Sequence, residues 1–358
     1  MAVVSLAVRD FRNIAGAELA FSPRLNLFTG DNGAGKTSLL EALYFLGRGQ
    51  SFRTSQPSQL IRSGAPSLLV TGQVQLAQGG VVPAGVERSK NATRIRFAGR
   101  PANIAELVGH LPFQLLSPDS HRLLDGGPRL RRRYLDWGVF HVEPAFLAAW
   151  QRFGRALRQR NAALRSRATD REIGLWDREL MATAEMLDRY RGAYLERLLP
   201  VVERYIAEFV EIPGLRWAYR RGWPLERDYI AALSEGLEAD RRQGFTRVGP
   251  HRADVAPILD NRPAQERLSR GQQKLVVAAM MLAQAFVYQQ QRGQPCLFLI
   301  DDLASELDAQ HRLRVLDHLR DMKAQLFLTA TEAGIVDTDW AEAKRFHVEH
   351  GRVSEVVY

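Results

Sequence analysis

One eight-residue segment, GDNGAGKT at Gly30–Thr37, constrains the fold of this chain more than any other. It fits the phosphate-loop pattern G-x-x-x-x-G-K-[ST]. A short apolar strand, LNLFTG, precedes it, and TSLLEALYFLG, with apolar residues at helical spacing, follows it. This context indicates a nucleotide-binding α/β unit rather than the alternative, a glycine-rich turn with a surface lysine.

Each residue type in the loop has a physical role. Three glycines allow the backbone to curl so that its N–H groups, together with the helix N-terminus, surround phosphates. Lys36 places a cation between the outer phosphates and is a candidate catalytic residue, while Thr37 offers its hydroxyl to Mg²⁺. The sequence therefore predicts a site for ATP and Mg²⁺ formed by Gly30, Asp31, Asn32, Gly33, Ala34, Gly35, Lys36, Thr37 and Ser38.

A phosphate loop needs a carboxylate to position its metal ion, and the segment CLFLIDDLASELD provides one. Four apolar residues precede Asp301, which places it at the tip of a buried strand, so we assign it to the metal. Asp302 follows and is the candidate that reaches toward an attacking water. The alternative is that both residues are ordinary strand-end caps.

The pattern of the chain changes twice. Alternating strands and the phosphate-loop helix fill the first part, and from about Phe113 to Phe245 the pattern becomes helical and arginine-rich. After Gly249 strands alternate with a helix again, as in a parallel sheet with crossover helices. We therefore expect an α/β head made of residues 1–112 and 246–358, interrupted by a mainly helical lobe at 113–245.

Positive charge is concentrated in the expected lobe. Residues 122–171 hold twelve arginines, no lysine and four acidic residues, a net of +8, against +9 for the whole chain. Arginine binds phosphate and stacks on bases, so this localisation favours a nucleic-acid partner, although a solvated helical face is the alternative. The sequence contains no base-reading motif. We therefore expect contacts to the nucleic-acid backbone and an affinity that falls as salt is added. The candidate DNA-binding residues are Arg131, Arg132, Arg152, Arg155 and Arg158.

One helix in this lobe has a clear apolar stripe. Phe146, Trp150, Phe153, Leu157 and Leu164 fall on one face at 3.6-residue spacing. The arginines between 152 and 167, including residue 160, fall off that stripe. We therefore expect the aromatic residues to be buried and the arginines to face solvent.

The remaining composition indicates a soluble cytoplasmic protein. The single cysteine, Cys296, lies in an apolar run and is expected to be a buried strand residue. The N-terminus lacks the pattern of a signal peptide. The longest apolar run, Leu275–Val287, is shorter than the ~20 residues that cross a bilayer.

A second segment, LSRGQQK at Leu268–Lys274, opens a helix with many hydrogen-bond donors and no acidic residue. Such a helix start suits an anion from elsewhere. With Gly30–Thr37 and Asp301–Asp308, this segment gives the chain a resemblance to the ATPase heads of the ABC and SMC superfamily. Leu268–Lys274 is similar to the superfamily signature LSGGQ, and Ser305–Asp308 to its D-loop.

In that superfamily the signature of one subunit binds the γ-phosphate of ATP held by another subunit. The resemblance therefore implies that Ser269, the Gly271 N–H group and Gln272 bind a phosphate in trans, within an ATP-dependent homodimer. It also implies the fold class, a P-loop ABC/SMC-type head with an inserted helical lobe.

A closer resemblance is to the bacterial recombination-mediator ATPases of this superfamily. It implies weak, DNA-stimulated ATP hydrolysis that acts as a switch. It also implies binding to single-stranded and gapped duplex DNA with little sequence specificity, and cooperation with recombination mediator proteins to load recombinase at stalled forks and gaps. The segments that carry it are SFRTS, LLSPDSHRLLDGGPRLRRRYLDWGVFHVEPAFLAAW, RQRNAAL and VGPHRADV, besides the three nucleotide motifs.

Two departures from the wider superfamily affect the expected chemistry. The usual glutamate after the metal aspartate is Asp302, whose side chain is one methylene shorter, so slow hydrolysis is expected. The histidine that often follows the last core strand is absent from FLTATE. A γ-phosphate sensor there would be the hydroxyl of Thr329 or Thr331.

Four further residues leave alternatives open. Gln114 is either the glutamine that links the metal to the inserted lobe or a surface glutamine. Arg12 and Arg53 are either nucleotide contacts or solvated. His251 has no second ligand at metal-binding spacing, so a structural role is expected.

Three other classes of protein compete with this interpretation. A transporter-type ATPase subunit shares the motifs but has a shorter spacing between phosphate loop and signature, and it docks on a membrane partner. An SMC-type structural protein requires a long heptad coiled coil, which the sequence lacks. A DNA-binding protein with a non-hydrolysing nucleotide site is separated from the main interpretation by a hydrolysis assay.

Overall fold

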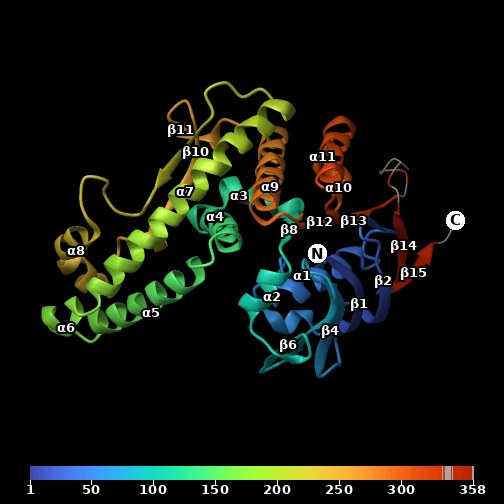
Figure 1. Ribbon diagram of the computed structural model, residues 1–358, viewed down its shortest axis with the longest axis horizontal. Helices are drawn as coiled ribbons and strands as arrows, with labels where there is room; N and C mark the ends of the chain where they lie inside the picture. The colour runs from blue at the N-terminus through green and yellow to red at the C-terminus, as the bar shows by residue number, and fades with distance from the viewer. Residues whose placement is uncertain (333, 335–339, 341, 357–358) are drawn as a thin grey trace. The chain divides into compact units, whose positions relative to one another are not determined.

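The computed structural model describes residues 1–332, 334, 340 and 342–356. It divides into two compact units, Met1–Ser120 with Met280–Tyr358 (the head unit) and His121–Ala279 (the helical unit; Figure 1). The sequence pattern instead places the return to the head at residue 246. The boundary differs because β10 (Asp254–Leu259) pairs antiparallel with β9 (Arg216–Arg220), which keeps the segment after residue 245 with the helices.

The head unit contains a mixed six-stranded sheet of order β15-β14-β3-β13-β12-β8. All of its strand pairs are parallel except β14 with β15. Its central strands are almost wholly buried, as parallel strands covered on both faces are. The predicted strands around residues 297 and 325, and the helix between them, are confirmed. The strands are β3 (Leu25–Thr29), β8 (Phe113–Leu116), β12 (Leu297–Ile300), β13 (Gln325–Ala330), β14 (Lys344–Glu349) and β15 (Arg352–Val356), and the intervening helices are α10 (Leu303–Glu306) and α11 (Ala309–Asp321).

A second, antiparallel sheet of the head has the order β2-β1-β4-β5-β6-β7. The alternating strands predicted for the first part of the chain are confirmed, and the first two form an antiparallel hairpin, β1–β2. A short helix, α2, follows this sheet and is capped by the Asn103 side chain. The elements are β1 (Ala2–Phe11), β2 (Ile14–Ala20), β4 (Ser67–Gln75), β5 (Val81–Ser89), β6 (Thr93–Phe97), β7 (Arg100–Pro101) and α2 (Ile104–His110).

Helix α1 (Lys36–Arg48) joins the two sheets in one core. Leu39, Leu40 and Leu43 are completely buried, in a cluster that includes Val70 of the antiparallel sheet and Phe327 of the mixed sheet. Eleven of its thirteen residues are buried, as in a helix of a protein core. This packing fixes the N-terminus of α1 at the edge where the parallel strands end, which is where ligands bind in such sheets.

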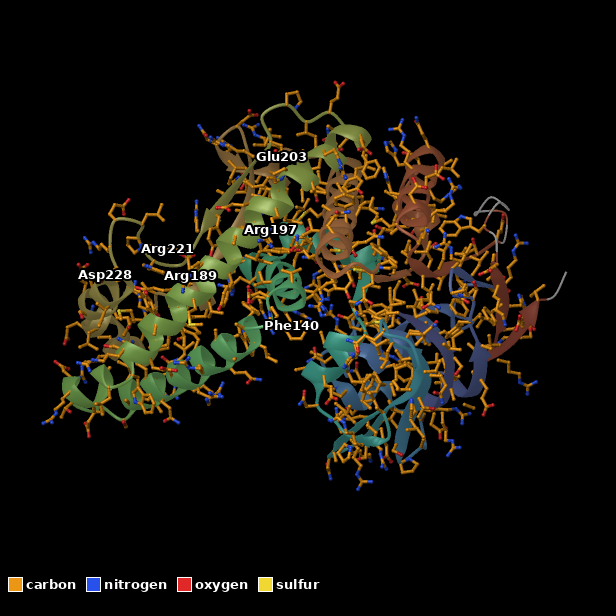
Figure 2. All side chains as sticks on the ribbon, in the orientation of Figure 1. Phe140, Arg189, Arg197, Glu203, Arg221 and Asp228 are labelled. Carbon is orange, nitrogen blue, oxygen red and sulfur yellow. The ribbon has the colours of Figure 1, made fainter. Side chains whose placement is uncertain are left out.

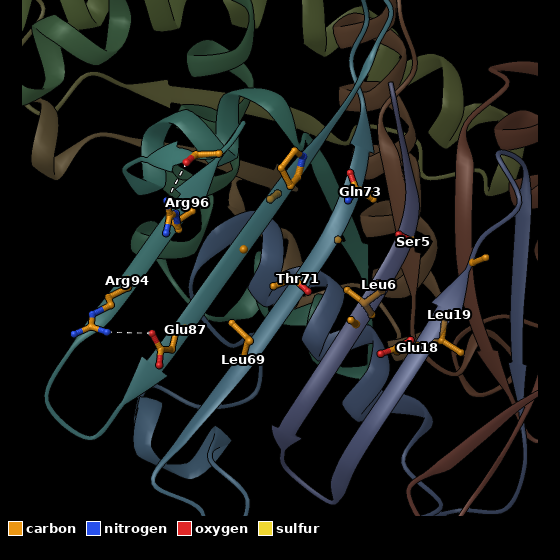
Figure 3. A pocket seen from close by; sticks show the side chains of 17 residues that line it. Ser5, Leu6, Glu18, Leu19, Leu69, Thr71, Gln73, Glu87, Arg94 and Arg96 are labelled. Carbon is orange, nitrogen blue, oxygen red and sulfur yellow. Dashed lines mark hydrogen bonds and ion pairs between the residues drawn. The ribbon is translucent and has the colours of Figure 1, made fainter.

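The antiparallel sheet also carries an open hollow of about 930 Å³ (Figure 3). Small side chains such as Ser5 and Thr71 line it, and the ion pair between Arg94 and Glu87, 3.6 Å apart, lies at one side. It shares no lining residue with the nucleotide cavity described below.

The helical unit is built around α5 and α7, which pack along one another. Phe146, Phe153 and Leu164 are buried as expected, but the prediction for Trp150 is wrong, because it is 51% exposed. The elements are α3 (Arg122–Asp125), α4 (Pro128–Val142), α5 (Phe146–Arg165), α6 (Asp170–Gly174), α7 (Asp177–Phe209), β9, α8 (Tyr229–Gln243), β10 and β11 (Arg262–Pro263), followed by the start of α9 (Arg270–Arg292).

One arginine of α5 is buried against expectation. The Arg160 side chain is fully buried, and it donates to Asp177 at 2.8 Å and to Asp240 at 2.7 Å. Helical spacing could not reveal this, because both carboxylates come from other helices. A buried arginine of this kind is tolerated because its charge is paired.

Within the described part of the chain, no helix is long and apolar enough to cross a membrane.

Candidate nucleotide site

The phosphate loop follows β3 and has a backbone that only glycine adopts easily. Gly30 has φ 142° and Gly35 has φ 122°. A Cβ on Gly30 would lie 2.1 Å from the carbonyl oxygen of Val348, so no side chain fits there. Asn13 Nδ2 holds the loop from outside by donating to the Ala34 carbonyl at 3.3 Å.

The N-terminus of α1, at the end of this loop, is open. No side chain caps it, and its first turn has no acidic residue. Lys36 Nζ folds back over the loop and donates to the carbonyls of Gly30 at 2.6 Å and Asp31 at 2.9 Å. Burial lowers the pKa of Lys36, and the charges of Asp302, Asp301 and Asp31 oppose this. Uncapped N–H groups beside a lysine form an anion site.

Asp301 directly follows β12 and faces the start of α1. Its Oδ1 accepts from the hydroxyl of Thr37 at 2.9 Å and from that of Thr329 at 2.8 Å. Burial raises the pKa of Asp301, and these two hydrogen bonds act in the opposite direction. A nearby cation stabilises the charged form of a carboxylate that is buried in this way.

The next residue, Asp302, has a left-handed backbone with φ 53°. Its N–H group donates to Thr329 Oγ1 at 2.8 Å. Thr329 is only 1% exposed, and its hydroxyl already contacts both aspartates. It is therefore a buried link between them, whereas the other sensor candidate, Thr331, is exposed at the cavity wall.

These groups surround a cavity of about 600 Å³ in the head unit. It contains the candidate nucleotide contacts Arg12 and Arg53, both of which line its wall. Segments distant in sequence meet here because β3, β12 and β13 end at one edge of the sheet. The lining residues are Arg12, Asn13, Asn32, Gly33, Gly35, Lys36, Thr37, Ser38, Arg53, Gln59, Ile61, Ser63, Asp301, Asp302, Thr329 and Thr331.

The donor set of this cavity fits Mg²⁺ bound together with phosphates. Among the described residues, no group of three or more acidic, histidine or cysteine side chains could hold a metal ion alone. Mg²⁺ is usually held by one or two carboxylates plus substrate phosphates. Thr37 and Asp301 supply a hydroxyl and a carboxylate whose oxygens are 2.9 Å apart, close enough to bind one Mg²⁺ together with phosphate oxygens.

Neither alternative for Gln114 matches its surroundings. Gln114 lies in β8, its side chain is 4% exposed, and it does not line the nucleotide cavity. Its Nε2 donates to Gln284 Oε1 at 2.8 Å. The prediction of a surface glutamine is wrong, because a buried amide needs a partner and Gln284 provides it.

The signature segment, Leu268–Lys274, begins α9 in the helical unit. Ser269 Oγ accepts from the Gln272 N–H group at 3.2 Å, and Gln272 Oε1 accepts from the Ser269 N–H group at 3.0 Å. This reciprocal pair is a capping box. Ser269 and Gly271 are exposed, whereas Gln273 is buried and donates to the Leu268 carbonyl at 3.0 Å.

The candidate DNA-binding arginines have different environments. Arg131 is 7% exposed and binds Asp254 through two hydrogen bonds of 2.8 and 2.9 Å. Its assignment to DNA is a misassignment, because its guanidinium supports the fold. Arg132 is half-buried and donates to the Ala253 carbonyl, and Arg152 pairs with Glu179 at the surface.

The other two candidates, Arg155 and Arg158, are exposed on α5. Further arginines, including Arg189 and Arg197, lie on α7 (Figure 2). The helical unit thus presents several cationic side chains to solvent after Arg131 is removed from the set.

His251 lies inside the helical unit. Its Nε2 is 3.0 Å from the Thr246 carbonyl oxygen, and burial lowers the pKa of His251 to about 4. The imidazole is therefore neutral at physiological pH, with Nε2 protonated to donate this bond.

The fold and the cavity together define a P-loop ATPase head of the ABC/SMC type. The family model described as RecF/RecN/SMC N terminal domain matches residues 2–354, and the chain belongs to this family. The resemblance to recombination-mediator ATPases is confirmed by curated relatives. The protein named DNA replication and repair protein RecF from Stutzerimonas stutzeri (strain A1501) is 43% identical over 362 residues, 99% of this chain and 98% of its own. Its namesake from Pseudomonas aeruginosa (strain LESB58) is 43% identical over 361 residues, with the same two coverages.

Solved structures agree on the fold. The recombination mediator protein RecF with ATP, of the RecFOR pathway, has a TM-score of 0.88 and 24% identity, covering 99% of this chain and 98% of that one. An Smc head bound to the C-winged helix domain of ScpA has a TM-score of 0.59 and 16% identity, with the same coverages. At these identities the likeness extends to the fold alone.

Proposed function

We propose that this chain is an ATP-dependent DNA-binding protein of replication and recombinational repair that hydrolyses ATP slowly. One observation carries the proposal: the head cavity brings Lys36 and Thr37 of the phosphate loop against Asp301. Relatives of nearly equal length are DNA replication and repair proteins by name. The RecF structure of the same fold is described with ATP.

In the proposed mechanism, the amides of Gly33–Lys36 and the Lys36 ammonium bind the triphosphate. Thr37 and Asp301 would hold Mg²⁺, which supplies charge neutralisation on the phosphates. Asp302 lines the cavity and orients the attacking water through its carboxylate. Its short side chain limits that reach, which supports slow hydrolysis and a switch rather than a metabolic enzyme.

The proposed switch is an ATP-dependent homodimer. Ser269 and Gly271 of one copy would contact the γ-phosphate held by the other copy. Their exposure and the α9 N-terminus support this role. ATP favours the joined state only to the extent that it contacts both copies.

DNA binding is proposed for the exposed arginines Arg152, Arg155 and Arg158 of the helical unit, together with the half-buried Arg132. Contacts of this kind are made to phosphates and carry little sequence information. Single-stranded and gapped duplex DNA are the proposed ligands, and cooperation with recombination mediator proteins in loading recombinase completes the proposal. Charge reversal of Arg152, Arg155 and Arg158 should weaken binding, and added salt should do so steeply.

Single-turnover ATP hydrolysis, measured with and without a gapped duplex, tests the proposal. We expect a rate far below the ~10 s⁻¹ typical of metabolic enzymes, increased by DNA. Asp302→Asn should retain ATP binding and lose roughly a hundredfold in rate. A rate near the metabolic value, or failure of the unmodified protein to bind ATP, would contradict the proposal.

A further inference from the structure

Glu41 is a buried carboxylate with no role in the chemistry proposed above. It lies on α1, the helix that begins at the phosphate loop, and its side chain is completely buried. A buried charge of this kind is costly unless it is paired and hydrogen-bonded. Its partners therefore identify what the charge is for.

The first partner is Arg12, at the turn between β1 and β2. Arg12 Nε and Nη2 each donate to a different Glu41 carboxylate oxygen at 2.8 Å. Arg12 Nη1 donates to the Gln59 carbonyl at 3.1 Å. These three bonds leave two of the five guanidinium N–H groups for a ligand, and the side chain is 20% exposed at the cavity wall.

The second and third partners come from the loop after α1. The Ser51 hydroxyl makes a short hydrogen bond to Glu41, and it also accepts from the N–H groups of Arg53 and Thr54, both at 2.9 Å. The Arg53 guanidinium lies 4.0 Å from the Glu41 carboxylate and lines the same cavity. Its charge also acts on Asp301, where it opposes the rise in pKa.

We propose that Glu41 is a positioning residue for nucleotide binding, which holds Arg12 and Arg53 as a cationic wall opposite the phosphate loop. The inference rests on the proposed ATP site and deepens it. One carboxylate orients two arginines from two segments, and α1 carries both this anchor and the phosphate-binding residues Lys36 and Thr37.

The physical reason is preorganisation. A free arginine loses rotamer entropy when it binds a phosphate, whereas one already fixed by a bidentate carboxylate loses little. Glu41 also offsets part of the charge of Arg12 and Arg53 before an anion arrives. The wall can then remain in place in the absence of ATP.

Glu41→Gln, Arg12→Ala and the double variant test the proposal. The amide keeps the size of Glu41 but cannot accept two charge-assisted bonds, so ATP affinity should fall roughly tenfold. In the Arg12→Ala background the same change should cost much less, because the residues act as a unit. The readouts are the equilibrium ATP affinity of folded protein at low temperature and the thermal unfolding midpoint.

Asp254→Asn is the matched control. Asp254 also binds an arginine, Arg131, with two hydrogen bonds, but it belongs to the helical unit and does not line the nucleotide cavity. It should lower the unfolding midpoint and leave ATP affinity unchanged.

A Glu41→Gln protein that behaves like this control, with lower stability and wild-type affinity, would overturn the positioning role alone. Fully additive losses in the double variant would overturn it as well. Failure of the unmodified protein to bind ATP would instead overturn the proposed function.

Discussion

Two helix N-termini of this chain differ in how their free N–H groups are satisfied. Helix α1 begins after Gly35 with no side-chain cap, whereas α9 begins with the reciprocal pair Ser269 and Gln272. Neither helix has an acidic residue in its first turn. No side chain therefore caps the first N-terminus, whereas at the second the Gln272 N–H group is already bonded to the Ser269 side chain.

This difference suggests different tasks. The uncapped N–H groups at α1 can donate hydrogen bonds to a phosphate at no cost in internal bonds, because no side chain has to be displaced first. At α9 the proposed phosphate contact would compete with the Ser269–Gln272 pair for the Gln272 N–H group, so we expect it to be weaker and conditional. That is suitable for a contact that forms only when a second copy brings the nucleotide.

The largest expected effect comes from a substitution at the N-terminus of α1. Lys36→Ala removes the cation folded over the loop and should reduce ATP affinity or hydrolysis by roughly a hundredfold or more. Equilibrium binding of ATP and single-turnover hydrolysis measure it. DNA binding measured without ATP is the control: whatever binding remains should be equal in the variant and the unmodified protein, because the arginines concerned lie in the helical unit. ATP affinity and hydrolysis rate both within a few-fold of the unmodified protein would contradict an α1 site.

A pH effect should separate the helical unit from the head. The pKa of His251 is lowered to about 4, so the folded state favours the neutral ring. The stabilisation of the folded state by the neutral His251 ring is complete above about pH 6.5, the pKa of histidine in the unfolded chain. It is lost as pH falls toward 4, by up to about 3 kcal/mol. Thermal unfolding between pH 7 and pH 4.5 measures this loss. His251→Gln should flatten the profile, and a profile identical to that of the unmodified protein would contradict the assignment.

Thr329 sharpens the description of the head site. Thr329→Val removes the hydroxyl that links Asp301 to the Asp302 N–H group, so hydrolysis should slow roughly tenfold and need more Mg²⁺. Thr329→Ser retains the hydroxyl and should restore both values. Equal impairment in the valine and serine variants would show that packing, not the hydroxyl, is what matters.

The smallest effect concerns the capping box at α9. Gln272→Ala removes the bond to the Ser269 N–H group and should destabilise the chain by about 1 kcal/mol. ATP affinity of the single copy should not change. Chemical denaturation and ATP binding provide the two measurements. A loss of ATP affinity without a loss of stability would contradict the assignment of this pair to helix capping.

Sequence reasoning reached the phosphate loop and Asp301 because both are local patterns. A glycine-rich loop between a strand and a helix, and an aspartate after four apolar residues, need no knowledge of the fold. The apolar strands around residues 297 and 325 are equally local patterns.

The misses have a common physical cause. Thr329 meets Asp301 only because β12 and β13 are neighbours in the sheet, and Arg12 meets Glu41 only after β1 packs beside α1. Sequence does not distinguish Arg131 from the other arginines, because its carboxylate partner Asp254 is distant in sequence. Composition could place charge in the helical unit, but only the packing shows which arginines are already paired.

Sedimentation with and without Mg-ATP tests the central claim most directly, namely that a nucleotide held at the phosphate loop joins two copies through Leu268–Lys274. The unmodified protein should sediment as a dimer with ATP, whereas Ser269→Arg should bind ATP with unchanged affinity and remain a monomer. A Ser269→Arg protein that still forms the ATP-dependent dimer would contradict the claim.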